Sequence, residues 1–207
     1  MSIPVESAPS PSNRALLFTS AYLVLQQGST LLRTLLLPRP DLMVRESQYI
    51  PGSTIGKHFR HLYDHFRLLL EALPANAAGA TLPKEDLLPP SPPQVFYDKR
   101  DRMVPMEKDP KIAAELIEDL VEKLRKLENR TELPLEAPIQ VQALIDGKSN
   151  YQLPLDSTLG RELWFCVHHA IHHYAMIKVV GAENDIQTAK DFGMAPSTIK
   201  YYDTLSS

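Results

Sequence analysis

The chain has 207 residues and a formal net charge of −3. This length suits one domain with a full hydrophobic core and does not require two. The nearly balanced charge argues against nucleic acid as a partner, because nucleic-acid surfaces normally carry a clustered basic excess. The single cysteine, Cys166, excludes intrachain disulfides and argues against a thiolate-built zinc site.

The first residues are rich in serine and proline and lack the basic and apolar segments of a signal peptide. We therefore expect a disordered N-terminus over residues 1–13 and a single domain over residues 14–207. The apolar stretch Ala15–Leu25 contains polar residues and is too short to span a bilayer. The sequence thus predicts a soluble, cytoplasmic protein with no membrane partner.

Four segments have the apolar spacing or the caps of long helices. Residues 14–37 form the first, which Pro38 ends. The second starts after Ser53, the expected N-cap. The third starts near Pro110, a favoured first-turn residue, and carries a regular apolar stripe. The fourth begins at residues 157–161, a stretch that nearly repeats the start of the second, and it is the most apolar of the four.

The connections between these segments are long. Residues 73–94 are rich in proline and alanine and predict a loop. Residues 139–145 begin with alternating positions and run into an Asp-Gly pair, which predicts a short β segment. Residues 188–200 are similar to a helix-turn-helix with Gly193 in the turn, so we expect an extra C-terminal helical segment. The predicted fold class is an all-α helix bundle.

The histidines are the most unevenly distributed residues in the chain. All seven lie in two short stretches, one on the second predicted helix and one on the fourth: His58, His61, His65, His168, His169, His172 and His173. The three of the first stretch share one helix face, because they are spaced i, i+3 and i+7. The second stretch contains two pairs with i, i+4 spacing.

That i, i+4 spacing lets two imidazoles bind one ion without distorting a helix. Together with one histidine of the first stretch, either pair would form a three-nitrogen site with open coordination positions. Such a site is typical of a reactive metal centre rather than of a sealed structural one. The alternative is a hydrated polar seam in which the histidines only pack and hydrogen-bond.

These histidines give the chain a resemblance to the DinB-like (DinB/YfiT) superfamily of four-helix bundles. His61 is the second histidine of a His-x-x-His run, while His169 and His173 match the ligand positions of the last bundle helix, with His172 between them. The DinB-like domain of the sulfoxide synthases that make thiol-histidines has the same arrangement, which favours His61 over His58. The resemblance covers most of the chain, and it implies a DinB/YfiT-like four-helix bundle whose metal ligands are His61, His169 and His173.

The resemblance also implies a chemistry. Characterised relatives include thiol-dependent transferases, so the expected cofactors are a divalent ion (zinc, nickel or iron) and a low-molecular-weight thiol. A maleylpyruvate isomerase of the superfamily has a glutamate where this chain has His169, and that activity is not supported. The expected activity is that of a metal-dependent transferase or hydrolase with a small-molecule substrate. His172 and His65 are the candidate catalytic residues, as proton-transfer groups.

Other functions stay open on the residues alone. The ion could serve only to stabilise a scaffold or a sensor. The tail could bind DNA, but its last helix has one basic residue, Lys200, and packing over one end of the bundle is the better expectation. Four residues before the third helix could bind an anionic substrate or form a solvated surface: Tyr97, Asp98, Arg100 and Arg102.

The remaining candidates are expected to be structural. His58 and His168 are assigned to packing, and Cys166 lies among apolar neighbours and is assigned to the core. Asp64, next to His65, is either a partner of the metal ligands or a solvated helix residue. Helix bundles often pair through an exposed apolar face, so a homodimer is compatible with the sequence.

Overall fold

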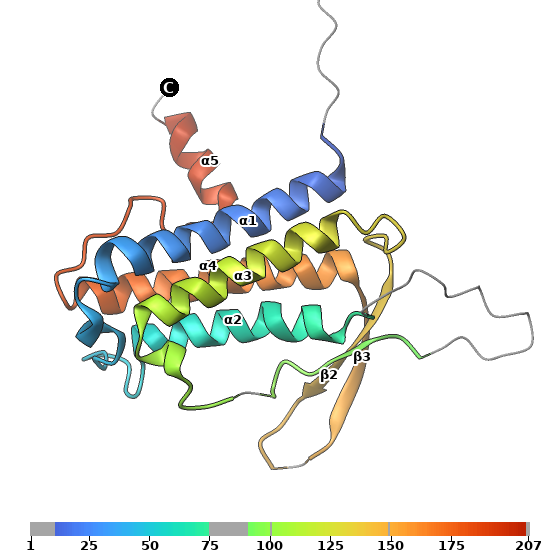
Figure 1. Cartoon of the computed structure of the whole chain (residues 1–207), viewed down its shortest axis with the longest axis horizontal. Helices are drawn as coiled ribbons and strands as arrows, with labels where there is room; N and C mark the ends of the chain where they lie inside the picture. Colours follow the sequence, from blue (N-terminus) through green and yellow to red (C-terminus); the bar gives the residue numbers. More distant parts are fainter. Residues whose placement is uncertain (1–10, 75–90, 100, 149, 206–207) are drawn as a thin grey trace, which may run out of the picture.

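The computed structural model describes residues 11–74, 91–99, 101–148 and 150–205. Four long helices lie side by side along its longest dimension (Figure 1). They are α1 (Asn13–Leu31), α2 (Ile55–Ala72), α3 (Pro110–Glu128) and α4 (Leu159–Ala182). Helix α1 packs on α3 and α4, and α2 packs on the same two helices. The predicted four-helix bundle is therefore confirmed.

The first helix agrees with the helix predicted over residues 14–37. Ser12 caps α1 by accepting a hydrogen bond from the amide of Ala15, and the helix continues through the π-helical turn η1 (Leu32–Leu36). The helical structure thus begins at Asn13, while residues 1–10 of the expected disordered N-terminus lie outside the described residues. By length and composition, Asn13–Leu36 is apolar enough to cross a membrane, with a mean hydropathy of 1.2. Here it packs as a bundle helix.

The hydrophobic core lies between the four helices. Its largest side chains have no solvent exposure and come from α1, α2 and α4: Phe18, Phe59, Phe66 and Tyr174. The Tyr174 hydroxyl donates a hydrogen bond to the carbonyl oxygen of Val24 at 2.8 Å, and its ring lies against Gly28, where a larger residue would collide with it. Close contact between α1 and α4 therefore depends on a glycine at this position.

Two short 3-10 helices, η2 (Pro40–Met43) and η3 (Pro105–Glu107), connect the long helices. They bury Met43 and Met106 against the core. Helix α3 begins as predicted, with Pro110 in its first turn and the Asp109 carboxylate accepting hydrogen bonds from two backbone amides. Of the expected loop over residues 73–94, residues 75–90 lie outside the described part of the chain.

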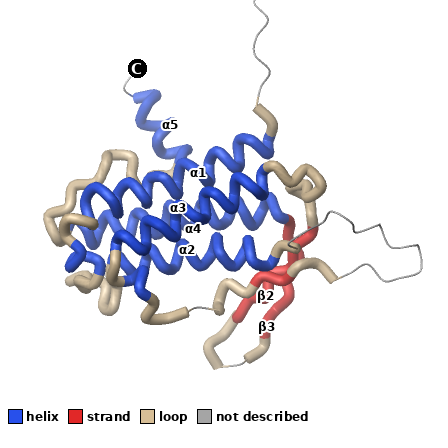
Figure 2. The backbone as a smooth tube through the Cα atoms, in the orientation of Figure 1, coloured by secondary structure: helices blue, strands red, loops and turns tan. Residues whose placement is uncertain are grey.

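A small sheet lies at one end of the bundle (Figure 2). Its order is β1 (Gln94–Val95), β2 (Pro138–Leu144), β3 (Gln152–Thr158). Strands β2 and β3 form an antiparallel hairpin with Val141 opposite Leu155, and β1 pairs with β2 in parallel. The β segment predicted near residues 139–145 is confirmed, but the all-α class is wrong here. The edge strand β3 was missed because it contains Pro154, which an edge strand tolerates.

The C-terminal helix α5 (Pro196–Leu205) follows a turn in which Gly193 has a φ of 71°. The predicted extra helical segment is confirmed, and Phe192 before it stacks on the buried ring of Tyr174 with centroids 4.7 Å apart. None of the residues of α5 itself is buried. Figure 1 shows α5 projecting away from α1.

Candidate metal centre

The two histidine-bearing helices begin in the same way. Thr54 caps α2 by accepting a hydrogen bond from the Lys57 amide, and Thr158 caps α4 by accepting one from the Arg161 amide. The prediction of Ser53 as the N-cap of the second helix is therefore wrong by one residue. Its hydroxyl instead lies 2.7 Å from Nε2 of His58.

A glycine in the first turn lets each of these helices approach other backbone closely. A Cβ on Gly56 would collide with the carbonyl of Glu107, and one on Gly160 would lie 3.1 Å from Cβ of Leu135. The near repeat in the sequence thus corresponds to the same local structure at the start of both helices. A threonine cap starts the helix, and a glycine sets how deeply its first turn packs.

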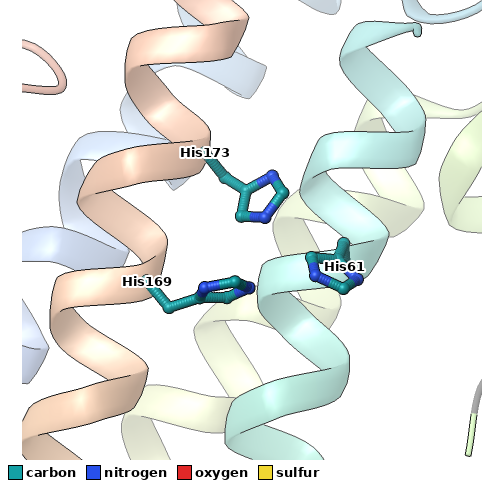
Figure 3. Close-up of side chains that lie close together, drawn as sticks. All are labelled: His61, His169 and His173. Atoms are coloured by element: carbon teal, nitrogen blue, oxygen red, sulfur yellow. The ribbon is translucent and has the colours of Figure 1, made fainter. Parts of the chain in front are cut away.

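Helices α2 and α4 bring three histidines together across their interface (Figure 3). His61 lies on α2, and His169 and His173 lie on α4. One ring nitrogen from each lies within 4.8 Å of the other two, and all three side chains are half-buried. Three imidazole nitrogens in this arrangement could hold a metal ion and leave coordination positions open. The expected ligands are therefore close enough to act together.

His58 also belongs to the cluster, although it was expected to be structural. Its Nδ1 lies 2.8 Å from Nδ1 of His173, and its Nε2 contacts Ser53. With Nδ1 of His173 occupied by this contact, Nε2 is the atom that His173 can offer to an ion. The sequence contained an indication that His58 belongs to the cluster, because His58 shares a helix face with His61.

His65 is the most buried histidine of the group, with 5% of its surface exposed. Its Nδ1 donates a hydrogen bond to the carbonyl oxygen of His61 at 2.9 Å, which fixes the proton on that nitrogen. Its ring centroid is 4.1 Å from that of His169, and Tyr97 stacks on it at 4.9 Å. His65 is thus held in direct contact with two of the three candidate ligands.

The second i, i+4 pair of α4 lies outside this cluster. His168 and His172 are both exposed. His168 stacks on the exposed Trp164 at 5.2 Å, while the ring of His172 lies 5.9 Å from that of His173. Of the two i, i+4 pairs, the structure therefore brings His169 and His173 to His61.

An aromatic wall covers one side of the cluster. Tyr97 stacks on His65, and Phe165 stacks on His169 with centroids 5.4 Å apart. The Tyr97 hydroxyl donates a hydrogen bond to the carboxylate of Glu162 at 2.9 Å, and burial raises the pKa of Tyr97 well above its usual range. This contact joins the segment after β1 to α4.

Glu162 binds the aromatic wall to α4 through its carboxylate, which accepts the hydrogen bond from Tyr97. Only 2% of its surface is exposed, and its second carboxylate oxygen accepts a hydrogen bond from the Ser157 hydroxyl at 2.6 Å. On the far side of the wall, between the hairpin and α4, a cavity of about 490 Å³ is lined by Asp98, Asp156 and Arg161 among others. Sequence reasoning missed the contact of Glu162 with the aromatic wall, because Tyr97 lies 65 residues away along the chain.

Burial keeps part of the cluster neutral. It lowers the pKa of His173 to about 3, with smaller contributions from the neighbouring His169 and His58. It also lowers the pKa of His58, with a contribution from His172. Neutral imidazole is the form of histidine that binds metals. The site therefore presents His173 as a ligand at neutral pH.

Asp64 lies on another face of α2 and does not join the histidines. It is 3% exposed, and its carboxylate pairs with Arg67 at 3.0 Å and lies 4.0 Å from Arg60. Burial raises its pKa, and the arginines oppose that rise. Of the residues expected to bind an anion, Tyr97 belongs to the aromatic wall, and Arg100 lies outside the described residues.

Cys166 is buried as expected, and burial raises the pKa of its thiol. Its sulfur lies 3.8 Å from the Tyr97 hydroxyl. A thiol that stays protonated is a poor nucleophile. The assignment of Cys166 to the core is therefore confirmed.

The family model of the DinB superfamily matches residues 25–177. This segment is more than half of the chain and contains the three candidate ligands, so the chain belongs to the DinB superfamily. The chain is also similar to FK506-binding protein 5 of Rhizopus delemar, with 39% identity over 105 residues. That match covers 51% of this chain and 26% of the relative, so it concerns about a quarter of the relative's length. No solved structure matches the chain significantly.

Proposed function

We propose that His61, His169 and His173 bind one divalent metal ion and that the protein is a metal-dependent transferase or hydrolase acting on a small molecule. The observation that carries the proposal is the approach of the three ring nitrogens to within 4.8 Å of one another. Because the i, i+4 pair comes from one helix and the third ligand from another, small movements of α2 against α4 would adjust the site to an ion.

The donor set suits zinc, nickel or iron, because imidazole nitrogen is a good ligand for all three. It does not suit magnesium or calcium, which prefer oxygen ligands. When bound, such an ion supplies Lewis acidity, which lowers the pKa of a water or a substrate thiol at an open position. Membership of the superfamily supports a low-molecular-weight thiol as the second cofactor.

The chain's own residues would orient the ligands and move protons. The contact between His58 and His173 holds the ring of His173 with Nε2 available. His65 donates a hydrogen bond to the carbonyl oxygen of His61 and lies directly against His169, and these contacts support the proposal that it exchanges a proton within the site. The exposure of His172 beside His173 supports the proposal that it passes protons to solvent.

The first test is metal analysis of the untagged protein and of His61→Ala, His169→Ala and His173→Ala. The proposal expects near-stoichiometric metal in the wild type and its loss in each variant. His168→Ala is the matched control, because this histidine is exposed on α4 and stacks on the exposed Trp164. A wild type without metal after incubation with zinc, nickel or iron would refute the proposal.

A metal-stabilised scaffold or sensor is the second candidate. It is favoured by the dense packing of the histidine rings between α2 and α4, since an ion there would tie the two helices together. Cobalt substitution separates the two functions. A visible spectrum that changes when a thiol is added indicates an exchangeable position and supports the enzyme, whereas an unchanged spectrum supports the scaffold.

A further inference from the structure

The outer face of α1 is uncharged. Between Arg14 and Arg33 the sequence has no charged residue, and two of the leucines in this stretch, Leu16 and Leu23, are 53% and 57% exposed. Helix α3 shows the opposite pattern, because its exposed positions carry several acidic and basic residues that pair with one another. A helix face without charges on an otherwise charged bundle is typical of a surface that another molecule covers.

Helix α5 leaves a second apolar surface exposed beside it. Its side chains Tyr201 and Leu205 are 60% and 65% exposed, and no residue of α5 is buried. A helix of this length is marginal in water without tertiary packing. Tyrosine is also enriched where one protein binds another. We therefore expect α5 to be stabilised by packing against a surface outside its own bundle.

The two surfaces meet in a groove. A cavity of about 620 Å³ runs between α1 and the segment that leads into α5. Its apolar lining includes Leu23, Leu31, Leu35, Phe192 and Ile199. Ile199 is the half-buried residue of α5, and the helix leaves the bundle beyond it. The chain thus carries an apolar groove next to a helix none of whose residues is buried.

From this arrangement we infer that the outer face of α1 and α5 form the interface of a homodimer, in which the occupant of each groove is α5 of a second copy. In a dimer with a two-fold axis, α5 of each copy lies in the groove of the other copy. Both apolar surfaces are then covered, because each copy supplies one helix and one groove. The inference does not depend on the metal site. Helix α5 also lies beyond residues 25–177, the part of the chain that matches the superfamily.

The available area is sufficient for a stable dimer. The helical stretch Asn13–Leu36 has 24 residues. With the usual helical rise, it offers a strip on the order of 350 Å², and half the circumference of α5 adds about 250 Å². The sum of about 600 Å² for each partner lies at the lower end of the range for a standard interface.

The charges near this face favour a second copy over a membrane surface. Lipid-binding faces normally carry lysine or arginine that is available for anionic headgroups. Here Arg14 donates to backbone carbonyls that include Glu128, and Arg33 pairs with Glu118 at 2.6 Å. The face also includes the polar groups of Gln26, which would lack partners in hydrocarbon.

The test is the oligomeric state of the full chain, measured by sedimentation equilibrium. We expect the wild type to be a dimer at micromolar concentration. Leu23→Glu on α1 and the double variant Tyr201→Glu/Leu205→Glu on α5 should each raise the dimer Kd by about thirtyfold or more. Tyr151→Glu is the matched control, because Tyr151 is 59% exposed in the connection between β2 and β3. Figure 1 shows this hairpin on the other side of the bundle from α5.

Circular dichroism and metal content of the same variants should stay at the wild-type level, which separates this inference from the proposed metal site. A monomeric wild type overturns the inference, as does a dimer that survives both sets of variants. Sedimentation with vesicles of phosphatidylcholine and phosphatidylserine is measured in parallel. A monomer that binds these vesicles would assign the face to a membrane and likewise overturn the inference.

Discussion

His173 is the residue on which the contacts of the histidine cluster converge. Four other imidazole rings have their centroids within 6 Å of its own, namely those of His58, His61, His169 and His172. Its Nδ1 is engaged by His58, so its orientation is fixed by a neighbour that would not bind the ion. Such outer partners usually tune the affinity of a site rather than create it.

Removal of His58 should therefore weaken metal binding without abolishing it. His58→Ala deletes the contact that orients His173, and we expect the metal Kd to rise by about 10- to 100-fold. Competition with a chromophoric chelator measures the change. His168→Ala should leave the Kd unaltered, and a complete loss of metal in His58→Ala would instead make His58 a ligand.

Acid should destabilise the metal-free protein through His173. Burial holds its pKa at about 3 in the folded state, against 6.5 for an ordinary histidine. Between these values the unfolded chain binds a proton that the folded protein does not, so the free energy of unfolding falls as the pH drops below about 6.5. Above that pH both states are neutral, and this contribution is constant.

Urea denaturation of the apoprotein across this range measures the effect. The variant His173→Asn should show a shallower loss of stability on acidification than the wild type, because it has no titratable group at that position. His168→Asn serves as the control on the same helix. Equal slopes for the wild type and His173→Asn would contradict the assigned pKa.

At the scale of the elements, the site depends on how the first turns of α2 and α4 pack in the bundle. Each begins with a threonine cap and a glycine in its first turn. The first turn of α2 lies against the backbone of Glu107 and Met43, whereas that of α4 meets Leu135 at longer distances. Both contacts involve backbone atoms, but a Cβ on Gly56 would overlap the carbonyl of Glu107, whereas one on Gly160 would lie more than 3 Å from Leu135, so the α2 contact is the less tolerant of the two.

Gly56→Ala should consequently destabilise the protein by about 2 kcal/mol, as expected for overpacking against a rigid neighbour. Gly160→Ala makes the same chemical change at the matching position of α4 and should cost less than about 1 kcal/mol. Thermal or urea unfolding of both variants measures the difference. Similar losses in the free energy of unfolding for the two variants would show that the backbone near Glu107 shifts to accommodate the added methyl group.

At the scale of the whole molecule, a bound ion would cross-link two helices that the chain separates by a long connection. His61 and the pair on α4 are about a hundred residues apart in sequence, and the sheet lies between them in chain order. An ion that binds only the folded state stabilises it by mass action.

Zinc at about 100 times its Kd should therefore add about 2.7 kcal/mol to the free energy of unfolding and raise Tm, and a chelator should reverse the change. The three alanine variants of the triad should show no such increase. A rise in Tm of equal size in His61→Ala would mean that zinc acts elsewhere on the protein.

The sequence by itself determined the features that depend on near neighbours. Apolar spacing located the four helices, Pro110 marked the start of α3, and the i, i+4 spacing identified two candidate histidine pairs on α4, of which the resemblance selected His169 and His173. Such features follow from contacts within a few turns of one helix, so their pattern is readable along the chain. The resemblance then selected His61 as the third member.

Only the tertiary structure decided which distant groups complete the site. His58 contacts His173 because α2 and α4 pack at a particular depth and rotation, which no local pattern encodes. Tyr97 and Glu162 meet for the same reason, and β3 exists only because β2 lies beside it. These contacts join residues far apart in the chain, and their geometry follows from the packing of the whole bundle.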